Sequence, residues 1–266
     1  MSVKLESLFN LKGQVALVTG GTGLLGGQIA DALAEQGADI VISSRNLDAC
    51  NKKCEQIKAD YPDVNIYATS LDLTKPESIK SCIENSKNHF GKIDILVTCA
   101  WSGRKNSWDT INDEDWNYDI EVCLNGVFRL IKAATDSLKE TKGVILNIGS
   151  MYGHVAPDYR LYEGVPQANP PSYGAAKAGI IQLTKYLGSF LAKDGIRANC
   201  ISPGPFPFEH VINEFPEFKQ RLCDKNPMGR LGKAHEIKGA AAFLCSEASS
   251  YMTGQNICID GGWAIW

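Results

Sequence analysis

Short apolar runs alternate with longer amphipathic segments along the whole chain. Apolar runs of strand length lie at 15–19, 38–44, 65–72, 93–100, 143–150, 196–204 and 256–260. Segments with helical spacing of apolar residues lie at about 25–36, 47–60, 76–90, 122–138, 173–193 and 234–245. Continuous apolar runs are typical of strands that are buried on both faces of a parallel sheet. The pattern therefore predicts seven strands separated by helices.

This order of elements predicts an α/β fold. Strands that alternate with helices form a mostly parallel sheet, with right-handed crossovers and helices on both faces. A chain of 266 residues buries one substantial core. We therefore expect residues 1–266 to form a single-domain, Rossmann-type three-layer sandwich with a seven-stranded sheet. Its ligands are expected at the carboxyl ends of the strands.

A glycine-rich loop joins the first predicted strand to the first helix, with the sequence TGGTGLLG at 19–26. Glycines let the backbone turn tightly and approach a pyrophosphate, and the following helix N-terminus supplies N–H donors. The strand, turn and helix context favours nucleotide binding over an ordinary turn. The predicted cofactor contacts here are Gly20, Thr22, Gly23, Leu24 and Leu25.

The end of the second strand reads SSRN at 43–46, with no carboxylate before Arg45. An acidic residue at this point binds the 2′-hydroxyl of NAD, whereas arginine accommodates the 2′-phosphate of NADP. Ser44 and Arg45 therefore favour NADP. NAD is the alternative, with Arg45 merely solvated on the turn. Asp72, after the third strand, is placed to accept from the adenine amino group or to cap the next helix.

Tyr173 and Lys177 lie four residues apart at the start of a long predicted helix, and so on one face of it. A free phenol titrates near pH ~10 and is a slow acid or base at neutral pH. A nearby fixed cation favours the phenolate. Ser150 ends the fifth strand, where its hydroxyl would polarise a substrate carbonyl. These three residues are the predicted catalytic group.

On these motifs the chain resembles the short-chain dehydrogenase/reductase superfamily over essentially its whole length. The matching segments are TGGTGLLG at 19–26, LDL at 71–73, SM at 150–151, YGAAK at 173–177, RANCISPGP at 197–205, PMGRLGKAHEI at 227–237 and TGQNICIDGGW at 253–263. The resemblance implies hydride transfer between a nicotinamide dinucleotide and a carbonyl or alcohol, with the Ser–Tyr–Lys roles on Ser150, Tyr173 and Lys177. It also implies that Lys177 binds the nicotinamide ribose. The remaining cofactor contacts are then expected at Leu73, Ala100, Pro203 and Gly204.

Three departures from the family pattern stand out. Leu24 occupies a glycine position of the common loop, and the remaining TGxxGxxG spacing is that of a longer, sugar-nucleotide-modifying branch. The Asn-Asn-Ala-Gly signature after the fourth strand reads TCAW at 98–101. Cys123, three residues before Gly126, stands where the family has its catalytic asparagine. Asn125 lies about 200° further round a helix and is not expected to replace it.

Tyr173 follows Ser150 by 23 positions (173 − 150), which is longer than the usual family spacing. The extra residues, at about 154–172, predict an insertion over the active site, where substrate contacts are made. The substrate candidates are Trp101, Tyr152, Arg160 and Tyr162. The segment SMYGHVAPDYRLYEG resembles a bacterial branch that modifies sugars and flagellin glycans. An ordinary surface insertion is the alternative.

Composition and charge exclude several other classes. The net charge is −3 and no basic run exceeds a pair, which argues against a nucleic-acid partner. No apolar stretch reaches membrane-spanning length, and the N-terminus lacks the pattern of a signal peptide. Nine cysteines without a C-x-x-C pair predict free thiols, no metal, and a reducing cytoplasm. Cys99, Cys200, Cys245 and Cys258 are expected in the core.

The sequence therefore predicts an NADP-preferring oxidoreductase that acts on a polar, sugar-like small molecule. A dinucleotide-binding regulatory protein with weakened chemistry is one alternative, because Cys123 replaces the asparagine. An epimerase or dehydratase that retains its nicotinamide is another. The resemblance also implies a homodimer or homotetramer that packs through late helices and the C-terminal strand.

Overall fold

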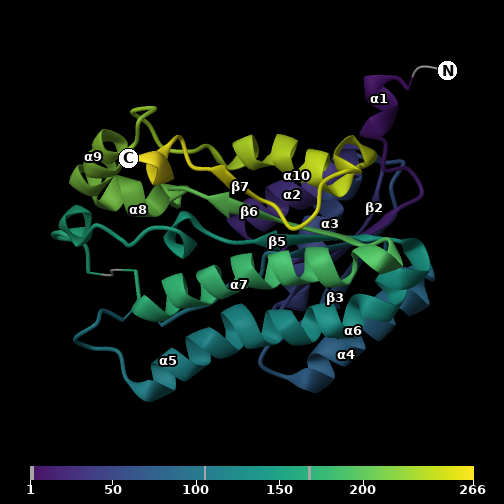
Figure 1. The fold of residues 1–266 in the computed structure, drawn as a ribbon, viewed down its shortest axis with the longest axis horizontal. Helices are drawn as coiled ribbons and strands as arrows, with labels where there is room; N and C mark the ends of the chain where they lie inside the picture. The colour runs from purple at the N-terminus through teal and green to yellow at the C-terminus, as the bar shows by residue number, and fades with distance from the viewer. Residues whose placement is uncertain (1–2, 105, 167–168) are drawn as a thin grey trace.

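A computed structural model describes residues 3–104, 106–166 and 169–266 of the chain. The strands in these ranges are β1 (Val15–Thr19), β2 (Asp39–Ser44), β3 (Ile66–Ser70), β4 (Ile95–Thr98), β5 (Val144–Ile148), β6 (Arg197–Pro203) and β7 (Asn256–Ile259). They form one sheet in the order β3-β2-β1-β4-β5-β6-β7, and each neighbouring pair is parallel (Figure 1). The predicted seven-stranded, Rossmann-type single domain is confirmed.

The helices connect these strands largely as predicted. They are α1 (Leu5–Leu8), α2 (Leu24–Glu35), α3 (Leu47–Asp60), α4 (Pro76–Phe90), α5 (Asp113–Ile120), α6 (Gly126–Thr141), α7 (Pro171–Phe190), α8 (Glu209–Glu214), α9 (Pro216–Lys225) and α10 (Lys238–Cys245). A π-helical turn (Glu121–Asn125) joins α5 to α6. The helical pattern did not predict α8 and α9, because α9 buries only Phe218 and Leu222 and α8 buries no side chain.

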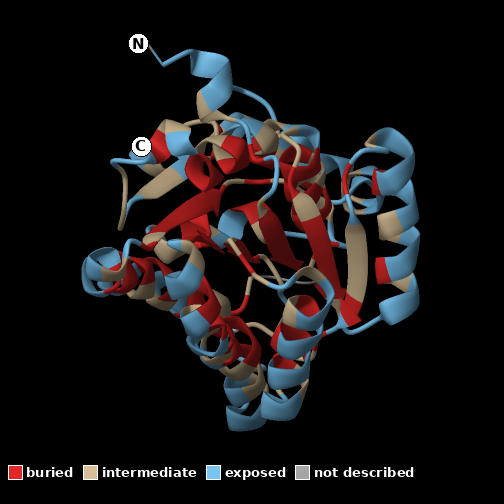
Figure 2. Ribbon diagram, turned by 90° about the vertical axis from the view of Figure 1, so that its right-hand side faces the viewer, coloured by how far each residue is buried: buried red, intermediate tan, exposed pale blue. Residues whose placement is uncertain are grey.

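Helices cover both faces of the sheet and give it three layers. The cluster on one face includes side chains of α2, α3 and α10, and the cluster on the other includes side chains of α4, α6 and α7 (Figures 1 and 2). Along β1, Ala16 and Val18 join the first cluster, whereas Val15 and Leu17 join the second. A strand buried on both faces needs apolar residues at consecutive positions, which explains the continuous apolar runs of the sequence.

The strand order reverses between β1 and β4, which are neighbours in the sheet. The chain leaves β1 toward one side and β4 toward the other, so the loops after these strands separate and leave a crevice at the carboxyl edge. This edge lies at the left of Figure 1, together with α8, α9 and the segment before α7. The fold therefore directs the glycine-rich loop and the loop after β4 to the same place.

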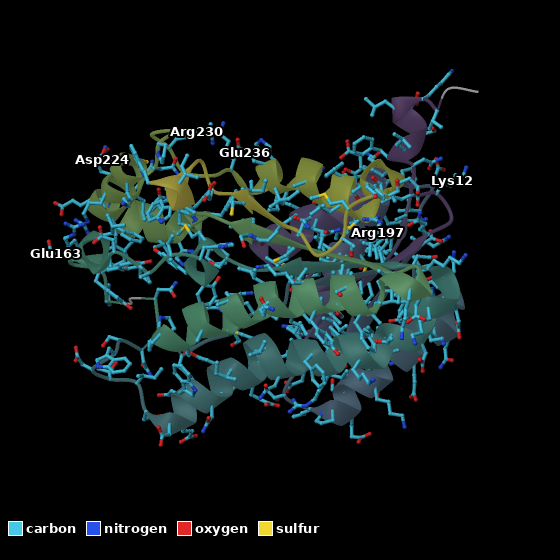
Figure 3. All side chains as sticks on the ribbon, viewed as in Figure 1. Lys12, Glu163, Arg197, Asp224, Arg230 and Glu236 are labelled. Carbon is cyan, nitrogen blue, oxygen red and sulfur yellow. The ribbon has the colours of Figure 1, made fainter. Side chains whose placement is uncertain are left out.

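The predicted insertion is a packed part of this edge over its described residues; residues 167–168 lie outside them. Its 3₁₀ turn, Tyr159–Tyr162, contributes Leu161 to a cluster with Phe218, Leu222 and Trp263. Arg221 of α9 donates to the Leu161 carbonyl at 2.9 Å and also to the Glu163 carbonyl (Glu163 is labelled in Figure 3). Helix α9 therefore holds the segment in place.

One expectation about the C-terminal part, the burial of Cys258, is wrong. Cys258 is exposed and not in the core, because β7 is the last strand of the sheet and has no neighbour on its outer edge within the described residues. Trp263 is buried, but Ile265 and Trp266 are 82% and 67% exposed in the single chain. In the described ranges, no helix is both long enough and apolar enough to cross a membrane.

Arg197 ties β6 to the end of α10 (Figure 3). Its Nη1 donates to the Leu244 carbonyl at 3.1 Å and to Ser249 Oγ at 2.9 Å, and its Nη2 donates to the Ser246 carbonyl at 2.9 Å. A cation at a helix C-terminus satisfies carbonyls that lack helical partners. Burial lowers the pKa of the Arg197 guanidinium, so these hydrogen bonds offset a cost of desolvation.

We expect Arg197→Met to lower the free energy of unfolding by about 3 kcal/mol, because it removes several hydrogen bonds from a charged donor and leaves carbonyls unsatisfied. Equilibrium denaturation at a fixed protein concentration measures the change. The control is Lys12→Met, which removes an exposed cation. Equal stability of the two variants would contradict this role of Arg197.

Candidate active site

A cavity of about 530 Å³ lies at the carboxyl edge of the sheet. All fourteen predicted cofactor residues line it, namely Gly20, Thr22, Gly23, Leu24, Leu25, Ser44, Arg45, Asp72, Leu73, Ala100, Tyr173, Lys177, Pro203 and Gly204. The predicted catalytic Ser150 and the substrate candidate Trp101 line it too. Residues from the ends of six strands, β1 to β6, thus line one cavity.

The glycine-rich loop lines the cavity and packs closely against its neighbours. Gly20 has φ of +66°, and a Cβ there would lie 2.7 Å from the Ala100 Cα atom. A Cβ on Gly26 would lie 2.2 Å from the Gly20 carbonyl oxygen, so α2 packs directly on the loop. Helix α2 begins at Leu24 and has no acidic residue in its first turn. Its N–H groups and dipole therefore fit an anion.

The residues at the end of β2 include a positive charge that would bind the 2′-phosphate of NADP, which NAD lacks. Arg45 is exposed at the cavity, and its Nη1 lies 3.4 Å from the Tyr118 hydroxyl. Asn46 accepts from the Ala49 N–H at 3.0 Å and so caps α3, which leaves Arg45 free to face the cavity. The guanidinium fits a 2′-phosphate in charge and position.

Asp72 lines the cavity and also organises the turn before α4. Its Oδ1 accepts from the N–H of Thr74 at 3.0 Å and from Thr74 Oγ1 at 2.7 Å. Partial burial acts to raise the pKa of the Asp72 carboxyl, but the Thr74 hydrogen bonds outweigh it and the pKa lies below its ordinary value. The carboxylate is therefore ionised at neutral pH. It is placed to accept from an adenine amino group, but it does not cap α4, whose N-cap is Lys75.

The three predicted catalytic residues approach the opposite end of the cavity. Lys177 is 5% exposed, donates from Nζ to the Ile148 carbonyl at 2.7 Å, and lies 5.8 Å from the centre of the Tyr173 ring. Ser150 precedes a 3₁₀ turn, and its Oγ accepts from the Tyr152 N–H at 3.1 Å. That contact uses a lone pair and leaves the Ser150 hydroxyl proton for another acceptor. The group is thus equipped to bind and protonate a carbonyl oxygen.

Aromatic side chains form the walls at this end. The Trp101 ring is 43% exposed and meets the Tyr173 ring edge-on, with 5.7 Å between centroids and 89° between planes. Phe206 and Phe208, which follow β6, also line the cavity. Other lining residues that were not predicted from the sequence are Gly26, Asn46, Leu71, Cys99, Ser102, Tyr118, Val122, Ile148 and Gly149. No local motif marks Ser102, Tyr118 or Val122, because each reaches the cavity through the fold.

Three substrate candidates lie outside this lining. The hydroxyls of Tyr152 and Tyr162 lie 2.9 Å apart in the cluster beneath the insertion, and burial raises the pKa of both phenols. The side chain of Arg160 is 87% exposed and binds Asp158 with N–O distances of 2.7 and 2.8 Å. Their substrate roles remain predictions that this placement does not support. Of the four candidates, Trp101 alone lines the cavity.

Cys123 lies in the π-helical turn, on the side of the loop after β4. It is 2% exposed, its thiol donates to the Ser102 carbonyl at 3.3 Å, and burial raises the thiol pKa. Asn125 is exposed and donates from Nδ2 to Glu121 Oε2 at 2.9 Å. Asn125 therefore faces away from Cys123, in agreement with the angle predicted from the sequence.

Comparison with known proteins agrees with this geometry. The model of the family described as enoyl-(acyl carrier protein) reductase matches residues 23–264. The 3-oxoacyl-(acyl-carrier-protein) reductase FabG of Escherichia coli is 36% identical over 254 residues, which are 95% of this chain and 98% of that protein. A sorbose reductase of Candida albicans is 35% identical over 262 residues, 96% of this chain and 89% of the relative.

Comparison with solved structures identifies the same kind of protein as the sequence comparison. A gluconate 5-dehydrogenase from Burkholderia cenocepacia, in complex with NADP and tartrate, is 30% identical and has a TM-score of 0.89. The match covers 99% of this chain and 100% of that one. The family model and relatives above 30% identity each span most of the sequence. The chain therefore belongs to the short-chain dehydrogenase/reductase family and is an NAD(P)-dependent oxidoreductase.

Proposed function

We propose that this protein uses NADP to interconvert a ketone and an alcohol on a small, polar, sugar-like molecule. One observation carries the proposal: Ser150, Tyr173 and Lys177 line the same cavity as the glycine-rich loop and Arg45. A regulatory protein without chemistry has no need for the buried Lys177 ammonium beside Tyr173. An epimerase would retain its nicotinamide and show no net NADPH consumption, which distinguishes it from the proposed enzyme.

The chemistry follows from the positions of the three side chains. NADPH, when bound, supplies the hydride to the carbonyl carbon. The Ser150 hydroxyl donates a hydrogen bond to the carbonyl oxygen, and the Tyr173 hydroxyl protonates it. The Lys177 ammonium, 5.8 Å from the Tyr173 ring, places a positive charge beside the negative charge that develops on the phenol as its proton leaves. In the oxidation direction Tyr173 accepts the proton from the alcohol.

One pair of residues and one relative support NADP over NAD. Ser44 and Arg45 provide a hydroxyl and a guanidinium at the end of β2. Among the described residues that line the cavity, the carboxylate closest to them in the sequence is Asp72, which follows β3 and not β2. The gluconate 5-dehydrogenase of Burkholderia cenocepacia was solved with NADP.

The proposed substrate class rests on the aromatic wall and on two relatives. The exposed Trp101 ring beside Tyr173 offers a face to the apolar side of a sugar ring, and Ser102 offers a hydroxyl. The relatives named for sorbose and gluconate act on such molecules. A 3-oxoacyl thioester is the second candidate, favoured by Phe206, Phe208 and the similarity to FabG. NADPH oxidation with keto sugars, keto acids and a 3-oxoacyl thioester separates the two.

The remaining proposals concern the surroundings of the site. We infer that the described residues of the predicted insertion, 154–166 and 169–172, lie over the substrate end, which the contact of α9 with their turn supports. The sugar and flagellin-glycan branch stays a prediction for this segment. Nine thiols without a disulfide in the described chain support a reducing cytoplasm. A homodimer or homotetramer is supported by exposed aromatic side chains on α6 and α7.

The first test removes the proton donor. Tyr173→Phe should lower kcat by about 10³-fold, because the general acid is lost, and should leave NADPH affinity within about twofold. Steady-state NADPH oxidation and fluorescence titration measure the two effects. Tyr159→Phe is the matched control, since its hydroxyl donates to the Asn169 carbonyl outside the cavity. Turnover at the wild-type rate in Tyr173→Phe would refute the assignment.

The second test concerns the choice of dinucleotide. Arg45→Ala should raise the KM for NADPH about 10-fold to 100-fold, because a charge-assisted hydrogen bond to phosphate is lost. The KM for NADH should stay within about threefold. Lys52→Ala, which removes an exposed cation from α3, should change neither constant. An equal loss with both dinucleotides would mean that Arg45 does not read the 2′-phosphate.

The third test concerns the assembly. On α7, Tyr186 and Phe190 are 58% and 51% exposed and stack with ring centroids 5.6 Å apart, and Phe128 of α6 is 53% exposed. Exposed aromatic groups of this kind mark interfaces. The double variant Tyr186→Glu/Phe190→Glu should form a smaller particle in light scattering. Tyr251→Glu, at a solitary exposed tyrosine, should keep the wild-type mass. An unchanged mass in the double variant would exclude this face.

A further inference from the structure

Asp119 is a carboxylate buried next to the active site that the proposed chemistry does not use. It lies in the last turn of α5 and is 2% exposed. Its Oδ1 accepts from the backbone N–H of Arg104 at 2.9 Å, and its Oδ2 accepts from Ser172 Oγ at 2.6 Å. Burial of a carboxylate is costly unless its oxygens are satisfied, so these two hydrogen bonds hold it in one position.

The two donors belong to two segments that contribute residues to the cavity lining. Arg104 is in the loop after β4, whose Trp101 and Ser102 line the cavity. Ser172 is the second residue of α7 and directly precedes Tyr173. Asp119 thus connects the wall at Trp101 to the helix that carries the proton donor.

Helix α7 depends on this contact at its start. Its N-cap is Pro170, its first residue is Pro171, and no side-chain cap hydrogen bond is formed there. Proline at the first position supplies no N–H, so the first turn lacks the usual polar anchor. Asp119 supplies one through Ser172. Its negative charge also lies at the positive end of the helix dipole.

The other wall is packed against the same carboxylate. A Cβ added to Gly103 would lie 3.3 Å from Trp101 Cζ2 and 3.5 Å from Asp119 Oδ1. Little free space therefore separates Asp119, Gly103 and the Trp101 ring. Since Trp101 also meets the Tyr173 ring edge-on, a shift at Asp119 is transmitted to both sides of the catalytic phenol.

We propose that Asp119 is a positioning residue that fixes the Tyr173 hydroxyl relative to the substrate wall at Trp101. The proposal rests on the proposed function, because it concerns the geometry of that reaction. A displacement of about 1 Å in a reacting group is enough to cost about 100-fold in rate. Asp119 acts through Ser172 on the phenol and through Arg104 on the wall.

The test compares three variants at this contact. Asp119→Ala should lower kcat about 10-fold to 100-fold and raise the KM for the carbonyl substrate, with NADPH affinity within about twofold. Ser172→Ala should lower kcat by less than that and leave KM unchanged, because the Arg104 contact persists. Asp119→Asn should stay within about threefold of wild type. Its carbonyl accepts from Arg104, and its amide donates to the Ser172 hydroxyl.

A control and a second measurement separate positioning from stability and from charge. Glu114→Ala removes an exposed carboxylate from the same helix and should change nothing. A lower melting temperature in Asp119→Ala with wild-type kcat and KM would overturn the proposal. So would an Asp119→Asn variant as impaired as Asp119→Ala, since charge alone would then explain the effect.

Hydrogen exchange tests the contact without any substrate. In Asp119→Ala, amides at 101–104 and 173–177 should exchange faster than in wild type, whereas in Glu114→Ala they should not. Unchanged exchange in both segments would overturn the proposal. If the wild-type protein oxidises NADPH with none of the carbonyls while the exchange result holds, the proposed function fails and the contact stands.

Discussion

The structure depends on one constraint, which is that every strand of its described sheet is parallel to its neighbours. Each strand must then be followed by a crossover that returns the chain to the end of the sheet where the strands begin. All the loops that follow strands therefore emerge together at the opposite, carboxyl end. The reversal between β1 and β4 opens a crevice among these loops. Residues from positions as distant as Gly20 and Gly204 therefore line one cavity, although nothing in their local sequences connects them.

Lys177 shows how this arrangement places a charge in the interior. Its ammonium is 5% exposed, and it stays there because it donates to the Ile148 carbonyl at the end of β5. The strand end and the helix that follows it thus fix each other. The electrostatic interactions of a buried ammonium are also stronger than those of an ammonium in water, because the surrounding dielectric constant is low. The proposed stabilisation of a phenolate at Tyr173 relies on this environment and would be weaker in water.

The parts of the site that the sequence predicted are those fixed by local chemistry. The glycine loop, Arg45 at the end of a strand, and the four-residue spacing of Tyr173 and Lys177 are each recognisable within a few residues. The walls are different, because Phe206 and Phe208 reach the cavity from a segment without a helical or strand pattern.

The sequence alone does not show an environment that depends on distant contacts. Cys258 lies in an apolar run but on the outer edge of the sheet, so it is exposed. Tyr152 and Tyr162 are polar aromatic residues beside the site, and their hydroxyls satisfy each other in a core. The residues next to a strand in the sequence do not show whether that strand lies at the edge of the sheet. Nor do the residues next to a tyrosine show which group its hydroxyl will hydrogen-bond.

The first turns of α7 and the proposed substrate wall are held by different kinds of contact. Tyr173 lies between two directional contacts, Ser172 to Asp119 at 2.6 Å and Lys177 to the Ile148 carbonyl at 2.7 Å. Hydrogen bonds of this kind resist both rotation and sliding of the helix. The wall of Trp101, Phe206 and Phe208 packs by apolar contact, which tolerates changes of shape at little cost. The proposed catalytic helix is therefore held by directional contacts, whereas the proposed substrate wall is free to change shape at little cost.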